Sequence, residues 1–129
     1  MIALDTNVVV RLLVDDDPAQ TRRARRLLEK HNVLVVPTVL LETEWVLRGA
    51  YEIKRPAVAR SMRMLLGLPT VVLAQAQAVV QALGWFEAGL DFADALHLAL
   101  AEDAEGLVTF DARLAKRARR ITAREVTAL

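Results

Sequence analysis

The chain has 129 residues, no cysteine and a formal net charge of +1 at pH 7. This length suits one domain with a buried core, so we expect a single domain over residues 1–129. A charge this close to neutral gives no overall basic field for nucleic acid, and the lack of cysteine excludes disulfides, thiolate metal sites and thiol nucleophiles.

Short apolar strands alternate with helices along the whole sequence. Strands are expected at residues 2–4, 33–36, 70–73, 107–109 and near 125–129. Helices are expected over residues 8–14, 19–30, 39–49, 56–66, 75–87, a segment opening at Asp91, and 112–119. Wholly apolar strands that alternate with helices are typical of a parallel sheet covered on both faces. The predicted fold class is therefore α/β with three layers.

No segment of the sequence has the pattern of a membrane span or a leader. No apolar run approaches the roughly 18 residues that a spanning helix needs. The N-terminal residues MIALDTNVVV lack a basic stretch and are interrupted by Asp5, which argues against a signal peptide. We therefore expect a cytoplasmic protein that does not cross a membrane.

Asp94 lies in the first turn of a predicted helix that is apolar nearly all round. A carboxylate in such a helix is costly unless a cation or hydrogen-bond donors meet it. Asp91, three residues earlier, fits a helix cap, and the cap is the simpler interpretation for that residue. For Asp94 a functional role is favoured, because matching acids occur elsewhere in the chain.

Four acids should lie at the same edge of the predicted sheet. Asp5 and Asp111 come directly after strands, whereas Glu42 and Asp94 lie in the first turns of helices that return to the sheet. Because each helix of a right-handed crossover runs antiparallel to its strands, both kinds of position lie at the carboxyl edge, where open α/β sheets bind ligands. We therefore expect the four carboxylates to share one cleft.

Carboxylates gathered in a partly dry cleft repel one another and need a counter-charge. His97, one turn from Asp94, is the nearest cationic candidate in sequence, but a core histidine bonded to a neighbour is the simpler interpretation for it. A hard divalent cation, Mg²⁺ or Mn²⁺, prefers carboxylate and water oxygens. Such an ion can polarise a phosphoryl oxygen and generate a hydroxide nucleophile, which is the chemistry of phosphodiester hydrolysis.

Glu42 must be distinguished from Glu44 on the same helix. Two residues apart, they point about 200° away from each other, so only one can face the cleft. Glu44 has Arg48 four residues later, which makes a favourable surface pair. We therefore predict that Glu44 is exposed to solvent and that Glu42 faces the cleft.

Three polar residues stand beside these acids in the sequence, namely Thr6, Asn7 and Thr109. Each has two interpretations. It can order a carboxylate or a water molecule at the site, or it can be an ordinary cap or turn residue, and for Thr6 the two weigh about equally.

Four stretches of the chain, LDTN, LLETEWVLRGAY, DFADALHLA and LVTFD, occur in the order and spacing of PIN-domain ribonucleases. The chain resembles this family over essentially its whole length, and most closely the VapC-type toxins of bacterial and archaeal toxin–antitoxin pairs. The resemblance implies a three-layer αβα domain with a central four- or five-stranded parallel sheet. It also implies Mg²⁺- or Mn²⁺-dependent RNA endonuclease activity, a homodimer, and a small antitoxin that blocks the site.

The family's acidic positions fall on Asp5, Glu42, Asp94 and Asp111, which the resemblance implies as catalytic residues and metal ligands. Asp91 belongs to a common variant of the third motif and is implied as an extra ligand or a support for one.

Two clusters of basic residues are candidates for contact with the RNA backbone, because the arginine fork suits phosphate. One comprises Arg22, Arg23, Arg25 and Arg26, and for it a solvated helix face is the simpler interpretation. The other comprises Lys116, Arg117, Arg119 and Arg120. It follows Asp111 closely and is therefore favoured for RNA contact.

Two other functions stay open on the sequence. One is a phosphatase or phospho-acceptor domain built on Asp5, which is weaker because a haloacid-dehalogenase-like phosphatase would want a second aspartate where Asn7 stands. The other is a PIN-like scaffold that binds metal or a partner without catalysis.

Overall fold

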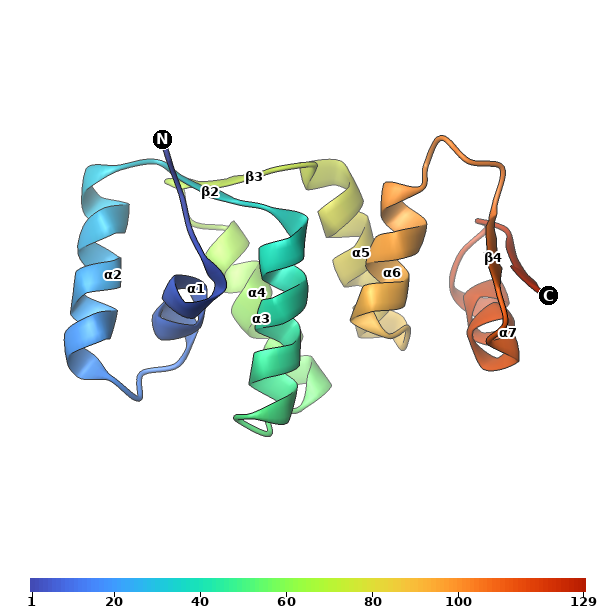
Figure 1. Ribbon diagram of the computed structural model, residues 1–129, viewed down its shortest axis with the longest axis horizontal. Helices are drawn as coiled ribbons and strands as arrows, with labels where there is room; N and C mark the ends of the chain where they lie inside the picture. Colours follow the sequence, from blue (N-terminus) through green and yellow to red (C-terminus); the bar gives the residue numbers. More distant parts are fainter. The chain divides into compact units, whose positions relative to one another are not determined.

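The computed structural model describes every residue of the chain, in two compact units that span Met1–Gln75 and Ala76–Leu129. Helices and strands alternate through both units (Figure 1). None of the seven helices has the length and hydropathy of a membrane-spanning segment.

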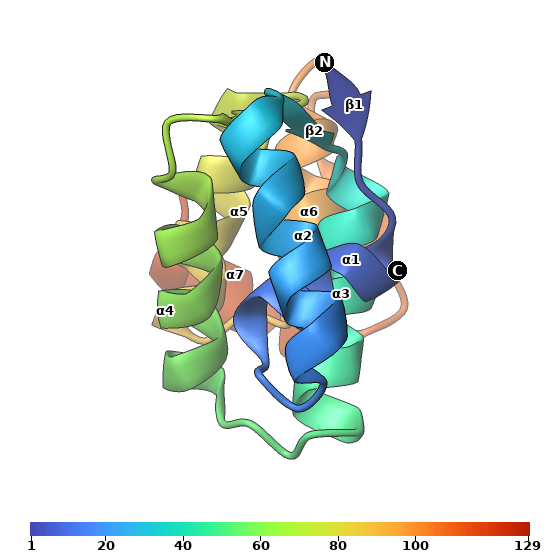
Figure 2. The ribbon, with the colours of Figure 1, turned by 90° about the vertical axis from the view of Figure 1, so that its left-hand side faces the viewer.

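The first unit contains three strands and four helices. In chain order they are β1 (Ile2–Ala3), α1 (Thr6–Leu13), α2 (Pro18–Lys30), β2 (Val33–Val35), α3 (Pro37–Gly49), α4 (Arg55–Leu66) and β3 (Val71–Leu73). The strands form one parallel sheet in the order β1-β2-β3, with Val33 opposite both Ile2 and Val71. Figure 2 shows α1 to α4 packed below these strands.

Local sequence explains where the helices of this unit begin. Proline occupies the first turn of α2, α3 and α4, where its fixed φ suits the helix and its missing N–H costs nothing. The helices then bury one apolar side each, and the fully buried side chains include Val9, Leu40, Leu47 and Val58. This packing holds the first turns of α1 and α3 in fixed positions.

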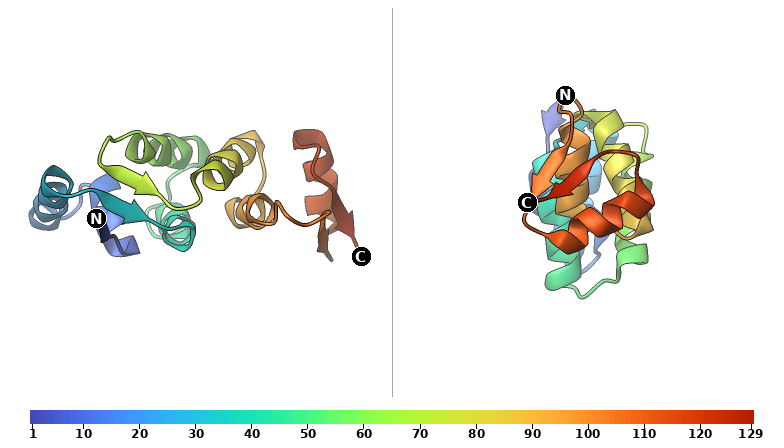
Figure 3. Two further views of the ribbon diagram at one scale, coloured as in Figure 1. Left: turned by 90° about the horizontal axis from the view of Figure 1, so that it is seen from above. Right: turned by 90° about the vertical axis from the view of Figure 1, so that its right-hand side faces the viewer.

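The second unit contains three helices and two strands. They are α5 (Ala76–Ala88), α6 (Phe92–Leu100), β4 (Leu107–Thr109), α7 (Ala112–Ile121) and β5 (Val126–Ala128). Strands β4 and β5 are parallel, with Leu107 opposite Val126, and α7 lies beside them (Figure 3, right). Helices α5 and α6 pack through Phe86 and Phe92, whose rings meet edge to face with centroids 5.4 Å apart.

The turn between α5 and α6 depends on one glycine. Gly89 follows the last turn of α5 with a φ of 126°, a conformation that residues with a Cβ rarely adopt. The N–H of Leu90 then donates to the carbonyl oxygen of Trp85, five residues earlier, which closes the last turn of the helix. The chain therefore changes direction at Gly89, two residues before Asp91, the N-cap of α6.

The predicted alternation of helices with parallel strands is confirmed, since each predicted element is present with ends that differ by at most two residues. The strands pair in parallel within each unit, three in the first and two in the second. Hydrophobic patterning predicts that a short strand exists but says little about which edge it pairs with. The existence of the strands was therefore accessible from the sequence, and their order within each sheet was not.

Candidate metal-binding site

A cavity of about 340 Å³ in the first unit is lined by Asp5 and Glu42, which are 37 positions apart in the sequence. Thr6 and Asn7 line the same cavity. The hydroxyl of Thr6, at the start of α1, donates a hydrogen bond of 3.3 Å to Oε1 of Glu42 on α3. The structure therefore supports the interpretation in which Thr6 orders a carboxylate, that of Glu42.

Asp5 occupies the N-cap position of α1, yet its carboxylate makes no capping hydrogen bond. The backbone carbonyl of Asp5 instead accepts from the N–H groups of Val8 and Val9, at 3.1 and 3.2 Å. A capping aspartate normally accepts a hydrogen bond from a backbone N–H of the first helical turn through one carboxylate oxygen. Both carboxylate oxygens of Asp5 are therefore available to a ligand in the cavity.

Arg11 also lines this cavity, but its charge is already engaged. Its guanidinium donates to Asp16 at 2.7 Å, to Gln20 at 2.6 Å and to Tyr51 at 3.1 Å. The hydroxyl of Tyr51 donates in turn to the second oxygen of Asp16, at 2.7 Å. Arg11 is thus neutralised by Asp16 and forms no ion pair with Asp5 or Glu42.

A second cavity, of about 180 Å³, lies in the second unit and gathers three of the predicted acids. Asp91, Asp94 and Asp111 line it together with Arg113 and Arg117. The acids come from the first turn of α6 and from the turn between β4 and α7. Helix beginnings thus supply each acid of this cavity.

Two of these three acids cap helices. Oδ1 of Asp91 accepts from the N–H of Asp94 at 3.2 Å, which confirms the cap interpretation for Asp91. Oδ1 of Asp111 accepts from the N–H groups of Arg113 and Leu114, at 2.9 and 3.1 Å. The hydroxyl of Thr109 accepts a hydrogen bond of 3.0 Å from the N–H of Asp111. Thr109 therefore stabilises the turn that follows β4, as an ordinary turn residue would.

Asp94 is the acid of this cavity whose carboxylate makes no hydrogen bond or ion pair. Burial raises the pKa of its carboxyl group, and the charges of Asp91 and Asp111 raise that pKa further, while His97 opposes them. His97 is exposed, so its interpretation as a core histidine was wrong. The negative charge at Asp94 is therefore poorly compensated, and a bound cation would relieve it.

The assignment of Glu44 to solvent was wrong. Glu44 is fully buried, whereas Glu42 is exposed where it lines the cavity. The expected partner was correct, because Arg48 forms an ion pair with Glu44. Glu44 lies between Leu40 and Leu47 on the side of α3 that faces the interior, at the four- and three-residue spacings that share one helix face.

The second basic cluster contributes one member to the acidic cavity. Arg117 lines it, while Lys116, Arg119 and Arg120 are exposed elsewhere on α7. Arg113 also lines the cavity and was missed by the sequence analysis. Its position one turn before Arg117 would have revealed it, since residues four apart share a helix face.

The donor sets fit a hard divalent cation better than any other metal. No group of three or more histidine, cysteine, aspartate or glutamate side chains within either unit is arranged to hold a metal by itself. Mg²⁺, however, is usually held by one or two carboxylates and keeps several water ligands. Asp5 and Glu42 in one unit, and Asp94 and Asp111 in the other, offer oxygen ligands of this kind.

The double role of Asp111 leads to a specific expectation. Asparagine caps a helix about as well as aspartate but carries no charge. We expect Asp111→Asn to keep the thermal stability of the metal-free protein while weakening Mn²⁺ binding. We expect Asp111→Ala to lose the cap as well, at a cost of about 1 kcal/mol. Thermal unfolding with and without Mn²⁺ measures both effects, and equal metal binding by Asp111→Asn and wild type would limit Asp111 to the cap.

Comparison with known proteins adds one finding. A family model described as the PIN domain matches residues 2–120 and so spans both units. PIN domains are generally metal-dependent nucleases. No curated protein matches the chain. Together with the alternating helices and parallel strands, the family match confirms the predicted three-layer α/β fold class. The chain therefore belongs to the PIN-domain family.

Proposed function

We propose that this protein is a Mg²⁺- or Mn²⁺-dependent endoribonuclease and the toxin of a type II toxin–antitoxin pair. Family membership supports the nuclease, and the resemblance of its four motifs to VapC-type toxins supports the toxin. PIN-domain nucleases act on RNA and often pair with antitoxins. The partners we propose are accordingly RNA, a cognate antitoxin and a second copy of the chain, in the cytoplasm and over a single domain of residues 1–129.

The observation that carries the proposal is that Asp5, at the N-cap of α1, and Asp94, in the first turn of α6, have carboxylates that make no capping hydrogen bond. We assign Asp5 and Glu42 in the first unit, and Asp94 and Asp111 in the second, as the catalytic acids that hold divalent cations. When bound, such a cation supplies Lewis-acid polarisation of a phosphoryl oxygen and lowers the pKa of water. Without a cation these acids would repel the phosphate of the substrate.

Other side chains of the two cavities have supporting roles in the proposed reaction. Thr6 fixes the orientation of the Glu42 carboxylate through its hydroxyl, and Asn7 offers an amide beside Asp5. Arg113 and Arg117 lie among the acids of the second unit and bind the negative backbone of RNA. The exposed charges of Lys116, Arg119 and Arg120 on α7 extend this contact.

The test is cleavage of single-stranded and structured RNA by the full chain in Mn²⁺ and in Mg²⁺, with EDTA as the matched control. We expect cleavage that requires the metal and that stops when EDTA is added. Metal binding without turnover on any RNA would favour a PIN-like scaffold. Labelling of Asp5 by acetyl phosphate would favour the phospho-acceptor function and contradict the proposal.

A further inference from the structure

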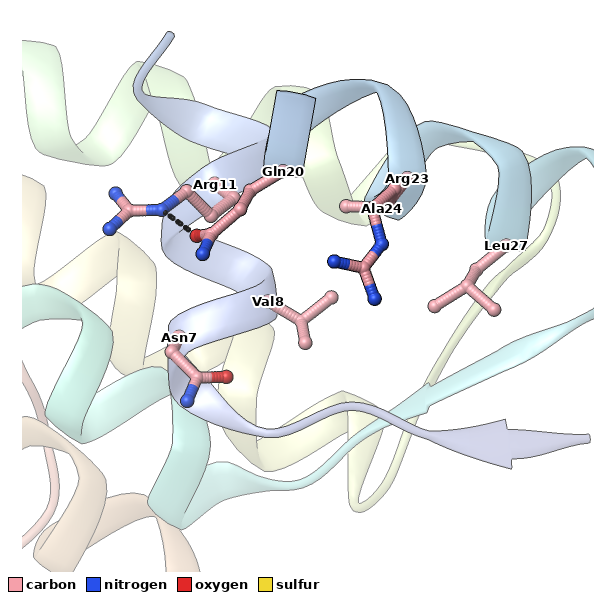
Figure 4. Close-up of a pocket in the computed structure, with 7 residues that line it drawn as sticks. All are labelled: Asn7, Val8, Arg11, Gln20, Arg23, Ala24 and Leu27. Atoms are coloured by element: carbon pink, nitrogen blue, oxygen red, sulfur yellow. Dashed lines mark hydrogen bonds between the residues drawn. The ribbon is translucent and has the colours of Figure 1, made fainter. Parts of the chain in front are cut away.

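A cavity of about 550 Å³ lies between α1 and α2 in the first unit (Figure 4). Seven residues line it: Asn7, Val8, Arg11, Gln20, Arg23, Ala24 and Leu27. This lining contains two guanidinium groups and two carboxamides, and it contains no carboxylate. Because Asp16 already neutralises Arg11, the positive charge that this cavity offers to an anion is that of Arg23.

The two arginines of this cavity differ in what they bind. The guanidinium of Arg11 is engaged by Asp16, Gln20 and Tyr51. Arg23 makes no hydrogen bond or ion pair, and its side chain extends from α2 into the cavity toward Val8 (Figure 4). A guanidinium presents donors in a planar fork that matches two oxygens of a phosphate. Arg23 is thus a phosphate-binding group without an occupant from the chain itself.

This cavity adjoins the one that contains Asp5 and Glu42. Asn7 and Arg11 line both of them, so the two cavities share a wall. One side of that wall presents carboxylates suited to a cation, and the other side presents a guanidinium suited to a phosphate. A polyanion with regularly repeated phosphates can place one phosphate at the acids and another at Arg23.

We propose that the cavity between α1 and α2 is a phosphate subsite for the RNA strand, and that Arg23 is its ligand. This inference rests on the proposed ribonuclease function, because it takes the Asp5 and Glu42 cavity as the place of reaction. RNA is favoured over an acidic protein segment because its repeated phosphates can bind in both cavities, one at the acids through a cation and another at Arg23. Of the cluster formed by Arg22, Arg23, Arg25 and Arg26, only Arg23 lines the cavity.

The experiment measures binding of a fluorescein-labelled polyuridine strand by the full chain in EDTA, over a series of salt concentrations. Each phosphate contact on a single strand contributes about 0.7 to the slope of log K against log salt. We expect Arg23→Gln to weaken binding and to reduce the slope by about 0.7. Arg22→Gln is the matched control, because Arg22 is the neighbouring residue on α2, exposed and outside the cavity. It should keep the wild-type slope.

Charge and geometry are separated by a second variant. Arg23→Lys keeps the charge but loses the fork, so we expect it to keep the wild-type slope while binding more weakly. Because Arg23 is exposed and makes no bond within the chain, all three variants should keep the melting temperature of the wild type.

Each contrary result has its own meaning. Equal slopes for Arg23→Gln and Arg22→Gln, or no binding of polyuridine by the wild type, would overturn the phosphate subsite. Arg23-dependent binding of polyglutamate without binding of polyuridine would also overturn it and assign the cavity to an acidic protein segment. Arg23-dependent binding of polyuridine by a chain that cleaves no RNA in Mn²⁺ would keep the subsite and contradict the ribonuclease.

Discussion

Asp94→Asn is expected to abolish metal-dependent RNA cleavage and, at the same time, to stabilise the metal-free protein at pH 7. The loss of cleavage should be on the order of 100-fold or more, as for the removal of other groups that stabilise charge in a transition state. The gain in stability follows because asparagine has nearly the same shape but none of the charge that is poorly compensated in this cavity. A merely structural role for Asp94 would not produce opposite effects on activity and stability.

The sign of this effect depends on pH. Burial, Asp91 and Asp111 hold the pKa of Asp94 above its ordinary value of 3.8, so the unfolded chain releases this proton first as pH rises. The free energy of unfolding of the wild type therefore falls as pH rises through that window, and the loss is complete above the folded-state pKa. The stabilising effect of Asp94→Asn should be full at pH 7 and should shrink as pH falls toward 3.8.

Metal should reverse the order of stability. A ligand at 100 times its Kd stabilises the folded state by about 2.7 kcal/mol, which for a domain of this size raises Tm by about 10 °C. Wild type should gain this stabilisation in Mn²⁺, and Asp94→Asn should gain little of it. Asp103→Asn is the matched control, because Asp103 is exposed and lines neither acidic cavity. Full activity in Asp94→Asn would reject the assignment.

Arg48→Met is expected to destabilise the fold by about 3 kcal/mol, or about 10 °C in Tm. Glu44 is fully buried, and Arg48 is its ion-pair partner on the next turn of α3. Removing one partner of such a pair leaves a charge in the interior, which costs far more than the pair itself contributes. Methionine keeps much of the aliphatic stem of arginine, so the change reports mainly on the charge.

Urea unfolding measures this effect, and the double variant Glu44→Gln/Arg48→Met is its internal control. We expect the double variant to be more stable than Arg48→Met alone, because it removes the uncompensated charge as well. Arg60→Met on α4 provides a matched surface control, since Arg60 is exposed and has no bond within the chain. A change below about 0.5 kcal/mol in Arg48→Met, typical of surface substitutions, would contradict the role given to this pair.

The acids were accessible from the sequence because their positions follow from element boundaries. Asp5 and Asp111 had to follow short apolar strands, and Glu42 and Asp94 had to lie in the N-terminal halves of helices. The structure puts Asp5 with Glu42 in one cavity, and Asp94 with Asp111 in another. Local pattern therefore predicted which acids lie outside the core, even though it could not predict the order of the strands within each sheet.

The burial of Glu44 was not accessible from the same pattern. The pair with Arg48 at four residues is typical of an exposed helix face, so this spacing predicts an exposed Glu44. Whether such a pair is buried depends on which neighbouring helices cover it, and α3 packs against both α1 and α4. Arg113, by contrast, was accessible, because it lies four residues before Arg117 on α7 and shares its helix face.

The claim that these carboxylates hold a divalent cation is tested most directly by calorimetric titration of the full, metal-free chain with Mn²⁺. We expect wild type to bind Mn²⁺, and Asp5→Asn to bind it at least about tenfold more weakly, which is about 1.4 kcal/mol. Asp103→Asn should bind as the wild type does. Absence of binding by the wild type, or an unchanged Kd in Asp5→Asn, would contradict the claim.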